Sequence, residues 1–192
     1  MSIDQKFSEN RKQAPAQAQE VVNFWLEAGP EKWFSKDENF DALFKQKFYD
    51  LHFAASRREY DNWASQPYSA LALIILLDQF PRNAFRDSPH MYATDTLALS
   101  YAERALKAGF IEQIEPALRK FMALPYMHSE NLSHQVRAVE LYQRYAPDAL
   151  KWAHGHHEII EKFGRFPHRN TVLGRRTTAD EQRFLDEGGF AG

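Results

Sequence analysis

The stretch Ala70–Asn83, with the sequence ALALIILLDQFPRN, decides the fold of this chain. The run Ala70–Leu77 is apolar without a break, too short to span a bilayer and typical of a helix buried on every side. Asp78 and Gln79 follow it, and then Phe80-Pro81. Proline disfavours helix for the residue before it and cannot continue a helix itself. The stretch therefore predicts a buried helix that ends at a corner carrying arginine and asparagine.

A second segment, Phe163–Asn170 (FGRFPHRN), repeats this pattern. Again an apolar helical run precedes Phe-Pro, and basic and amide side chains follow. We refer to Leu77–Asn83 and Phe163–Asn170 as the first and second Phe-Pro motifs. Their similarity favours either one shared pocket or two structural clamps, and the sequence leaves both interpretations open.

Helical periodicity and end signals extend from these motifs over most of the chain. Predicted helices span about residues 17–28, 35–51, 66–79, 91–108, 112–123, 129–145 and 149–163, with a short last helix from 178. Their boundaries rest on capping-box spacings at Ser35–Glu38 and Thr178–Glu181, on Ser129 as an N-cap, and on stops at Gly29-Pro30 and Pro125.

No segment alternates with period two, so no sheet is expected. The predicted fold class is all-α, a compact array of about seven to eight antiparallel helices. Residues 1–16 are expected to form a flexible N-terminal arm, and residues 17–192 a single helical domain.

Composition narrows the class of protein. The chain has 192 residues, 44% of them hydrophobic, which suits one globular domain. Its net charge of −2 does not favour nucleic acid as a partner. The chain contains no cysteine, which excludes disulfides and thiolate chemistry. With a polar start and no long apolar run, we expect a cytoplasmic protein without a membrane partner; the oligomeric state stays open.

Several strings in the chain resemble a bacterial family known as domain-of-unknown-function family 924. They are Phe24-Trp25, Trp33–Asp37, Phe40-Asp41, Ala70–Asn83, Met127–Glu130, Ile159–Asn170, and Leu173–Arg175 with Thr178 and Glu181. The resemblance extends from about Val21 to Phe184. It implies an all-helical fold similar to tetratricopeptide-repeat superhelices, and it implies no activity.

The second Phe-Pro motif carries the first group of candidate site residues: Arg165, His168, Arg169, Asn170 and, a little further on, Arg175. Guanidinium groups bind carboxylate or phosphate in fork geometry. These cations would therefore suit a small anionic ligand or a peptide carboxylate. Alternatively, they satisfy the free carbonyls at a helix end and complement its dipole.

The first Phe-Pro motif provides a second group, made of Asp78, Gln79, Arg82 and Asn83. Asp78 closes an apolar run, so it is expected to be buried and to need a partner. Arg82 or a cation from the second motif would serve. The pair is either architectural or a carboxylate held ready for proton transfer.

The third group is His128-Ser129-Glu130. Ser129 as an N-cap and Glu130 in a first helical turn have ordinary structural explanations. His128 has none, and imidazole titrates near neutral pH. His128 is therefore the candidate general acid or base.

A fourth group lies in the helix over residues 149–163, where His156 falls on the apolar face and is expected to point inward. His157 and Glu161 are spaced to share a metal ion, but that spacing alone is weak and a solvated charged face explains it better. We predict no metal site and no cofactor.

Three functional hypotheses follow from these groups. In the first, a binding protein holds a small anionic molecule or peptide with Arg82, Arg165, Arg169 and Arg175, with Asn83, Asn170 and His156 lining the same pocket. In the second, an enzyme uses His128 or His168 to move a proton, with Asp78 or Glu130 orienting the imidazole. In the third, both motifs are clamps in a protein-interaction scaffold.

Overall fold

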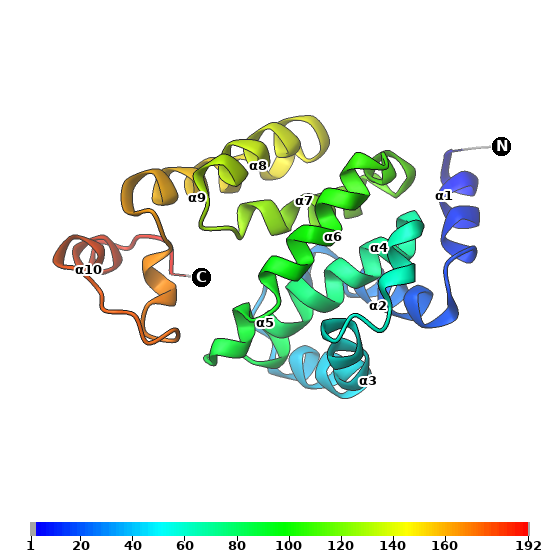
Figure 1. The fold of residues 1–192 in the computed structure, drawn as a ribbon, viewed down its shortest axis with the longest axis horizontal. Coiled ribbons are helices and arrows are strands. Elements are labelled where there is room, and N and C mark those ends of the chain that lie inside the picture. Colours follow the sequence, from blue (N-terminus) through cyan, green and yellow to red (C-terminus); the bar gives the residue numbers. More distant parts are fainter. Residues whose placement is uncertain (1–2, 192) are drawn as a thin grey trace.

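The structure is a computed structural model that describes residues 3–191, and this part of the chain is all-α, as predicted, with no strand. Its α-helices are α1 (Ile3–Lys12), α2 (Ala16–Trp33), α3 (Glu38–Ser56), α4 (Pro67–Ile74), α5 (Phe80–Ala84), α6 (Asp95–Lys107), α7 (Pro116–Met127), α8 (Leu132–Tyr145), α9 (Leu150–Phe163) and α10 (Ala179–Asp186). Helices α7, α8 and α9 pack in succession, and α1 and α10 lie at opposite ends of the molecule (Figure 1).

Helix α1 lies in the segment that the sequence predicted to be a flexible arm. Phe7 on this helix is buried, Asn10 donates a hydrogen bond to the Gln113 carbonyl at 3.3 Å, and Arg11 pairs with Glu115 at 3.4 Å. The sequence of α1 is mostly polar, so its periodicity gave no helical signal. Long-range contacts to a domain that folds around α4 hold this helix in place.

The first Phe-Pro motif does not end a helix, contrary to the prediction. Helix α4 continues through a π-helical turn, η2 (Ile75–Gln79), directly into α5. The N–H of Phe80 donates to the carbonyl of Ile75, five residues back. In a regular α-helix the ring of Pro81 would clash with the carbonyl of Leu77. The wider π-turn accommodates that ring, and the chain stays helical to Ala84.

The π-turn changes which groups satisfy its carbonyls. The carbonyl of Leu76 loses its regular donor because the Phe80 N–H is used one residue earlier, and Leu77 loses its donor because proline has no N–H. His52 Nδ1–H donates to Leu76 at 2.8 Å, and the Thr94 hydroxyl donates to Leu77 at 2.5 Å. Side chains from α3 and from the start of α6 thus complete the hydrogen bonding of the buried helix.

Several predicted boundaries are confirmed. Gly29 interrupts α2 with a φ of 71°, and Gly164 ends α9 with a φ of 68°. Both values lie in the left-handed region that favours glycine. Thr178 and Glu181 form the predicted capping box at the start of α10, with both reciprocal hydrogen bonds present.

Three other boundary predictions are wrong. Asp37, not Ser35, caps α3 by accepting from two backbone N–H groups. Pro125 lies inside the last turn of α7, which runs to Met127. Asn131 caps α8, so Ser129 precedes the helix and bonds His134 at 2.9 Å instead. At α3 and α8, Asp37 and Asn131 take the capping role that spacing alone assigned to a serine.

The apolar core has two parts. The main core surrounds the fully buried α4–η2 segment and draws on α2, α3, α6, α7 and α8. A smaller C-terminal core consists of Ile159, Ile160 and Phe166, with Phe163, Phe184 and Phe190 packed against it. The first Phe-Pro motif belongs to the main core and the second to the smaller one. None of the helices in residues 3–191 is long and apolar enough to cross a membrane.

Candidate functional site

The π-turn positions Asp78 at the centre of a charged cluster. Asp78 is fully buried, and its Oδ1 accepts a hydrogen bond from His128 Nδ1 at 2.6 Å. Its Oδ2 accepts from Gln79 Nε2 at 2.7 Å, and Arg82 Nη1 lies 3.5 Å from Oδ1. His128 lies at the end of α7, fifty positions from Asp78 in the sequence, and the folded main core brings the two residues together.

The protonation of this pair follows from its surroundings. Burial would raise the pKa of Asp78, but electrostatic interaction with His128 and Arg82 and the two hydrogen bonds outweigh burial and lower it. Burial and the Arg82 charge lower the pKa of His128 in spite of Asp78. At neutral pH, Asp78 is therefore ionised and His128 is a neutral imidazole that donates from Nδ1. Its Nε2 has no hydrogen-bond partner among residues 3–191, and its side chain is 12% exposed.

Arg82 and Arg169, one from each Phe-Pro motif, meet at Asp95 on the first turn of α6. Arg82 makes a two-pronged contact with the Asp95 carboxylate, at 2.8 and 2.9 Å, and also donates to the Asp78 carbonyl at 2.7 Å. Arg169 Nη1 reaches the same carboxylate only at 3.5 Å. The two motifs therefore meet at the Asp95 carboxylate, which binds Arg82 closely and Arg169 only weakly.

Apart from its long contact with Asp95, the guanidinium of Arg169 is held between aromatic rings. It lies on the 3₁₀ turn η6 (Pro167–Arg169), and its guanidinium carbon is 4.5 Å from the ring centres of both Tyr92 and Phe166. Its Nε is buried and has no hydrogen-bond partner. Its Nη2 also has no partner among the described residues. Arg165 uses its Nε and Nη2 groups together to bind Glu181. On Arg169 the same Nε–Nη2 edge has no partner among the described residues.

The other predicted cations of the second motif are clamps. Arg165 pairs with Glu181 at 2.5 and 2.8 Å. Arg175 pairs with both oxygens of Glu130 at 2.7 and 3.0 Å and donates to the Phe166 carbonyl at 3.1 Å. Glu130 also accepts from the Phe166 N–H at 2.8 Å. These contacts fasten the loop after α9 to α10 and to the loop before α8, so the predicted site roles of Arg165, Arg175 and Glu130 have no support in their geometry.

The two predicted asparagines have different surroundings. Asn83 donates to Asp41 at 2.7 Å, and Arg86 grips the same carboxylate, so Asn83 belongs to a separate buried pairing with α3. Asn170 donates to Glu181 at 3.3 Å, while its buried Oδ1 has no partner. The amide nitrogen of Asn83 is thus already used on Asp41, and a shared ligand-orienting role for the two asparagines stays a prediction.

His156 and His168 lie against the ring of Phe166, at centroid distances of 5.4 and 5.7 Å. His156 is buried, as predicted, and its Nδ1–H donates to the Trp152 carbonyl at 2.8 Å. Burial and nearby cationic groups lower the pKa of His156 to about 4 and that of His168 to about 3. Both rings are therefore neutral at pH 7, and the Nδ1 of His168 is buried without a partner.

The sequence missed two members of this cluster, Tyr92 and Asp95. Asp95 has the signal of an ordinary acidic residue in a first helical turn, and Tyr92 lies in the short turn η3 (Pro89–Tyr92), which periodicity does not resolve.

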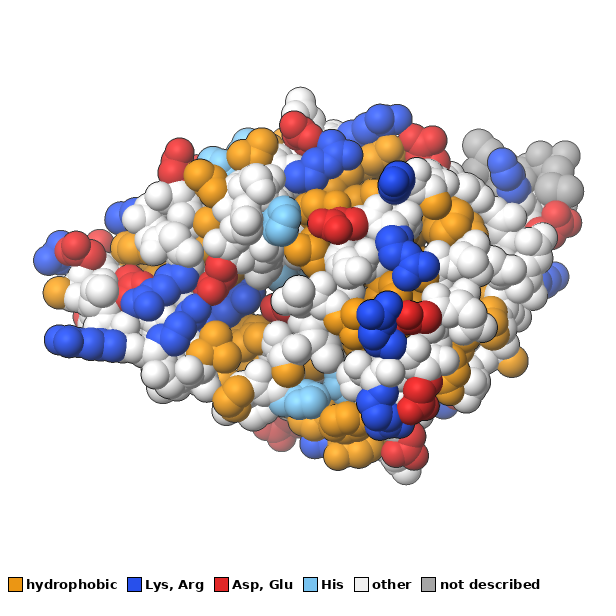
Figure 2. Space-filling view, in the orientation of Figure 1, with side chains coloured by type: hydrophobic (Ala, Val, Ile, Leu, Met, Phe, Trp, Pro, Cys, Tyr) orange, Lys and Arg blue, Asp and Glu red, His pale blue; other side chains and the backbone are white. Residues whose placement is uncertain are grey.

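Figure 2 shows the surface hollowed near the middle of its face, with histidine and charged side chains of both signs at the edge. In Figure 1 this region lies between the C-terminal segments and α5.

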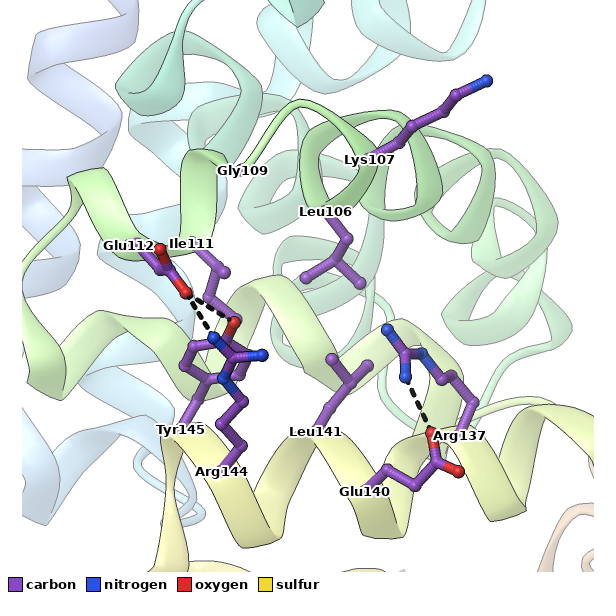
Figure 3. Close-up of a pocket in the computed structure, with 10 residues that line it drawn as sticks. All are labelled: Leu106, Lys107, Gly109, Ile111, Glu112, Arg137, Glu140, Leu141, Arg144 and Tyr145. Atoms are coloured by element: carbon purple, nitrogen blue, oxygen red, sulfur yellow. Dashed lines mark hydrogen bonds and ion pairs between the residues drawn. The ribbon is translucent and has the colours of Figure 1, made fainter.

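A separate surface pocket of about 230 Å³ lies between the end of α6, the turn η4 (Phe110–Gln113) and α8 (Figure 3). Glu112 there accepts from Arg144 at 2.8 Å and from Tyr145 at 3.0 Å, and Arg137 pairs with Glu140 at 2.7 Å. Its arginines are thus exposed and already paired, unlike Arg169. In residues 3–191, no three His, Asp or Glu side chains gather in a way that could hold a metal ion.

These observations define the class as an all-α protein with a buried carboxylate–histidine pair beside two arginines. The chain belongs to the family described as bacterial protein of unknown function, DUF924, whose profile matches residues 21–189. It is similar to the solved structure of ATU0120, a protein of unknown function from Agrobacterium tumefaciens. The two share 49% identity and a TM-score of 0.88, covering 90% of this chain and 98% of the other. A comparison with curated proteins gives no match.

Proposed function

We propose that this protein binds a small anion through the free Nε–Nη2 edge of Arg169. The supporting observation is that the residue Arg169 is 6% exposed, its Nε lacks a partner, and its Nη1 lies 3.5 Å from the Asp95 carboxylate that Arg82 already binds. Burying a charge without full pairing is costly. A ligand that supplies the missing acceptors would offset that cost.

The electrostatics agree with this proposal. Burial and the nearby Arg82 charge lower the pKa of Arg169 to about 10, whereas Arg82 shows the opposite direction because Asp95 and Asp78 outweigh its burial. A planar carboxylate matches the fork of an arginine edge, so a small organic acid or the C-terminal carboxylate of a peptide suits the site.

Ligand binding to the native state raises the melting temperature, and this tests the proposal directly. We expect sodium acetate or sodium phosphate, titrated at constant ionic strength, to raise the melting temperature of the wild type. The Arg169→Met variant should lose this shift. Arg144→Met, which removes an exposed arginine paired with Glu112, should retain it. An equal shift in wild type and Arg169→Met would reject the proposal.

A second candidate is an enzyme, favoured by the 2.6 Å hydrogen bond between Asp78 and His128. A carboxylate that fixes Nδ1–H leaves Nε2 free as a general base beside the proposed anion site. Histidine ¹⁵N NMR distinguishes this candidate from simple binding. Acetate should shift the Nε2 signal of His128, and Asp78→Asn should change its tautomer. If saturating acetate leaves that signal unmoved, His128 does not face the bound anion and cannot act on it.

A further inference from the structure

The chain turns back sharply after α10. Gly188 has a φ of 83°, and its N–H donates to the Leu185 carbonyl at 3.1 Å. Gly189 donates to the Phe184 carbonyl at 2.9 Å. A Cβ at Gly189 would lie 2.5 Å from both the carbonyl oxygen and the ring of Phe184. The path of this segment, Gly188–Phe190, therefore depends on two consecutive glycines; we call it the C-terminal strap.

The strap delivers one aromatic side chain to the second Phe-Pro motif. The Phe190 ring centre lies 4.6 Å from that of His156 and 5.1 Å from that of His168. Both imidazoles also pack on Phe166, and Phe166 supports the guanidinium of Arg169. Phe190 and Arg169 are thus connected through one group of rings, because Phe190 lies on His156 and His168 and Arg169 lies on Phe166.

We propose that Phe190 occupies the apolar half of the Arg169 site and that the ligand is an aromatic carboxylate, whose ring takes the place of Phe190 while its carboxylate binds Arg169. This inference rests on the proposed function. A phenyl ring on His156 and His168 shows what kind of group these imidazoles accept. A carboxylate attached to such a ring would combine both halves of the site in one molecule.

The wall that the ring would contact is suited to an uncharged group. His156 and His168 are both neutral at pH 7, because burial lowers their pKa values to about 4 and about 3. Among the residues that the structure describes, Arg169 is the one cation that lies over the ring of Phe166. A small ligand with a single carboxylate and a flat apolar body therefore fits this arrangement better than a polyanion.

Isothermal titration calorimetry at pH 7 with sodium acetate and sodium benzoate tests the inference on the full chain. We expect Phe190→Ala to bind benzoate at least about five-fold more tightly than the wild type, with acetate affinity unchanged within two-fold. Gly189→Ala should reproduce this preference with Phe190 still present, because its Cβ displaces the strap from Phe184. Arg169→Met should lose both ligands.

The outcomes separate the two proposals. If acetate binds through Arg169 but Phe190→Ala and Gly189→Ala leave the benzoate-to-acetate ratio unchanged, the strap inference is wrong and the anion site stands. If Phe190→Ala weakens benzoate binding, Phe190 is part of the binding wall and does not compete with the ligand, which also overturns the inference. If Arg169→Met binds both ligands like the wild type, the proposed function itself fails. Circular dichroism melting curves confirm that each variant is folded.

Discussion

The two Phe-Pro motifs share Phe-Pro followed by arginine and asparagine, but they play different parts in the structure. In the first, the chain stays helical through Pro81, and Arg82 grips Asp95 with two hydrogen bonds. In the second, Gly164 ends the helix, and three consecutive residues carry a buried polar atom without a partner. These atoms are His168 Nδ1, Arg169 Nε and Asn170 Oδ1.

This difference distinguishes a motif whose polar groups are satisfied within the fold from a motif that carries the candidate site. The first motif lies in the main core, where donors from α3 and α6 satisfy the carbonyls that the π-turn leaves free. Buried polar groups in native proteins are satisfied with few exceptions, so three exceptions in a row call for an explanation. A ligand that approaches Arg169 supplies one.

The largest expected effect comes from removing each arginine in turn. Arg82→Met would leave the buried Asp78 and the partly buried Asp95 with less positive charge, and breaking a buried pair costs about 3–5 kcal/mol. Arg169→Met should change the free energy of unfolding by less than about 1 kcal/mol, because this guanidinium is poorly paired. Urea denaturation at pH 7 measures both. Equal losses would mean that the two motifs are equivalent clamps.

Acid should weaken the first motif through His52. Its Nδ1–H is used on the Leu76 carbonyl, so its Nε2 accepts from His90 Nε2–H at 2.9 Å. Burial lowers the pKa of His52 to about 4, so the unfolded state binds the proton more readily. Its contribution, about 3 kcal/mol, is complete above pH 6.5 and is lost as the pH falls through 4.

Urea denaturation at pH 6.5 and pH 4 checks this expectation. His52→Gln should lose about 3 kcal/mol less than the wild type over this interval. His154→Gln, a change at an exposed histidine of α9, should lose as much as the wild type. If both variants lose the same amount, His52 does not control the acid sensitivity of the π-turn.

The sequence predicted most of the helices because their apolar periodicity and glycine stops are local signals. It did not predict the π-turn, because the string LDQFP contains a strong helix-ending signal. That signal is overridden by His52 and Thr94, which are distant in sequence and reach the freed carbonyls only in the folded chain.

The candidate site was predictable to a similar extent. Asp78, His128, Arg82 and Arg169 stood out because polar residues next to apolar runs need partners, and the structure brings all four into one cluster. The sequence could not predict which arginine makes fewer hydrogen bonds. That depends on the contacts of the Asp95 carboxylate, which binds Arg82 closely through both oxygens and Arg169 only at 3.5 Å. The pairing of Asn83 with Asp41 could not be predicted either, because Asp41 is one acidic residue among many on predicted helices.

A smaller effect is expected at Thr94, which replaces the donor that Pro81 lacks. Thr94→Val would leave the Leu77 carbonyl without its donor, at a cost of about 2 kcal/mol. In a Pro81→Ala background the restored N–H offers another donor, so the same change should cost less. Urea denaturation of the wild type, the two single variants and the double variant completes a double-mutant cycle that measures the coupling. Additive losses would show that Thr94 does not compensate for the proline.

The smallest effect concerns the glycine that makes the second motif a helix end. Gly164 has a φ of 68°, so Gly164→Ala should destabilise the protein by about 1 kcal/mol. Gly155 is the matched control, because it lies inside α9 and a Cβ there meets nothing within 4 Å. Gly155→Ala should stabilise the protein by up to about 1 kcal/mol. Thermal melts of both variants compare the signs. A stabilising Gly164→Ala would mean that α9 can continue toward Phe166, as the first motif does, and that the two motifs differ less in their backbones than in their partners.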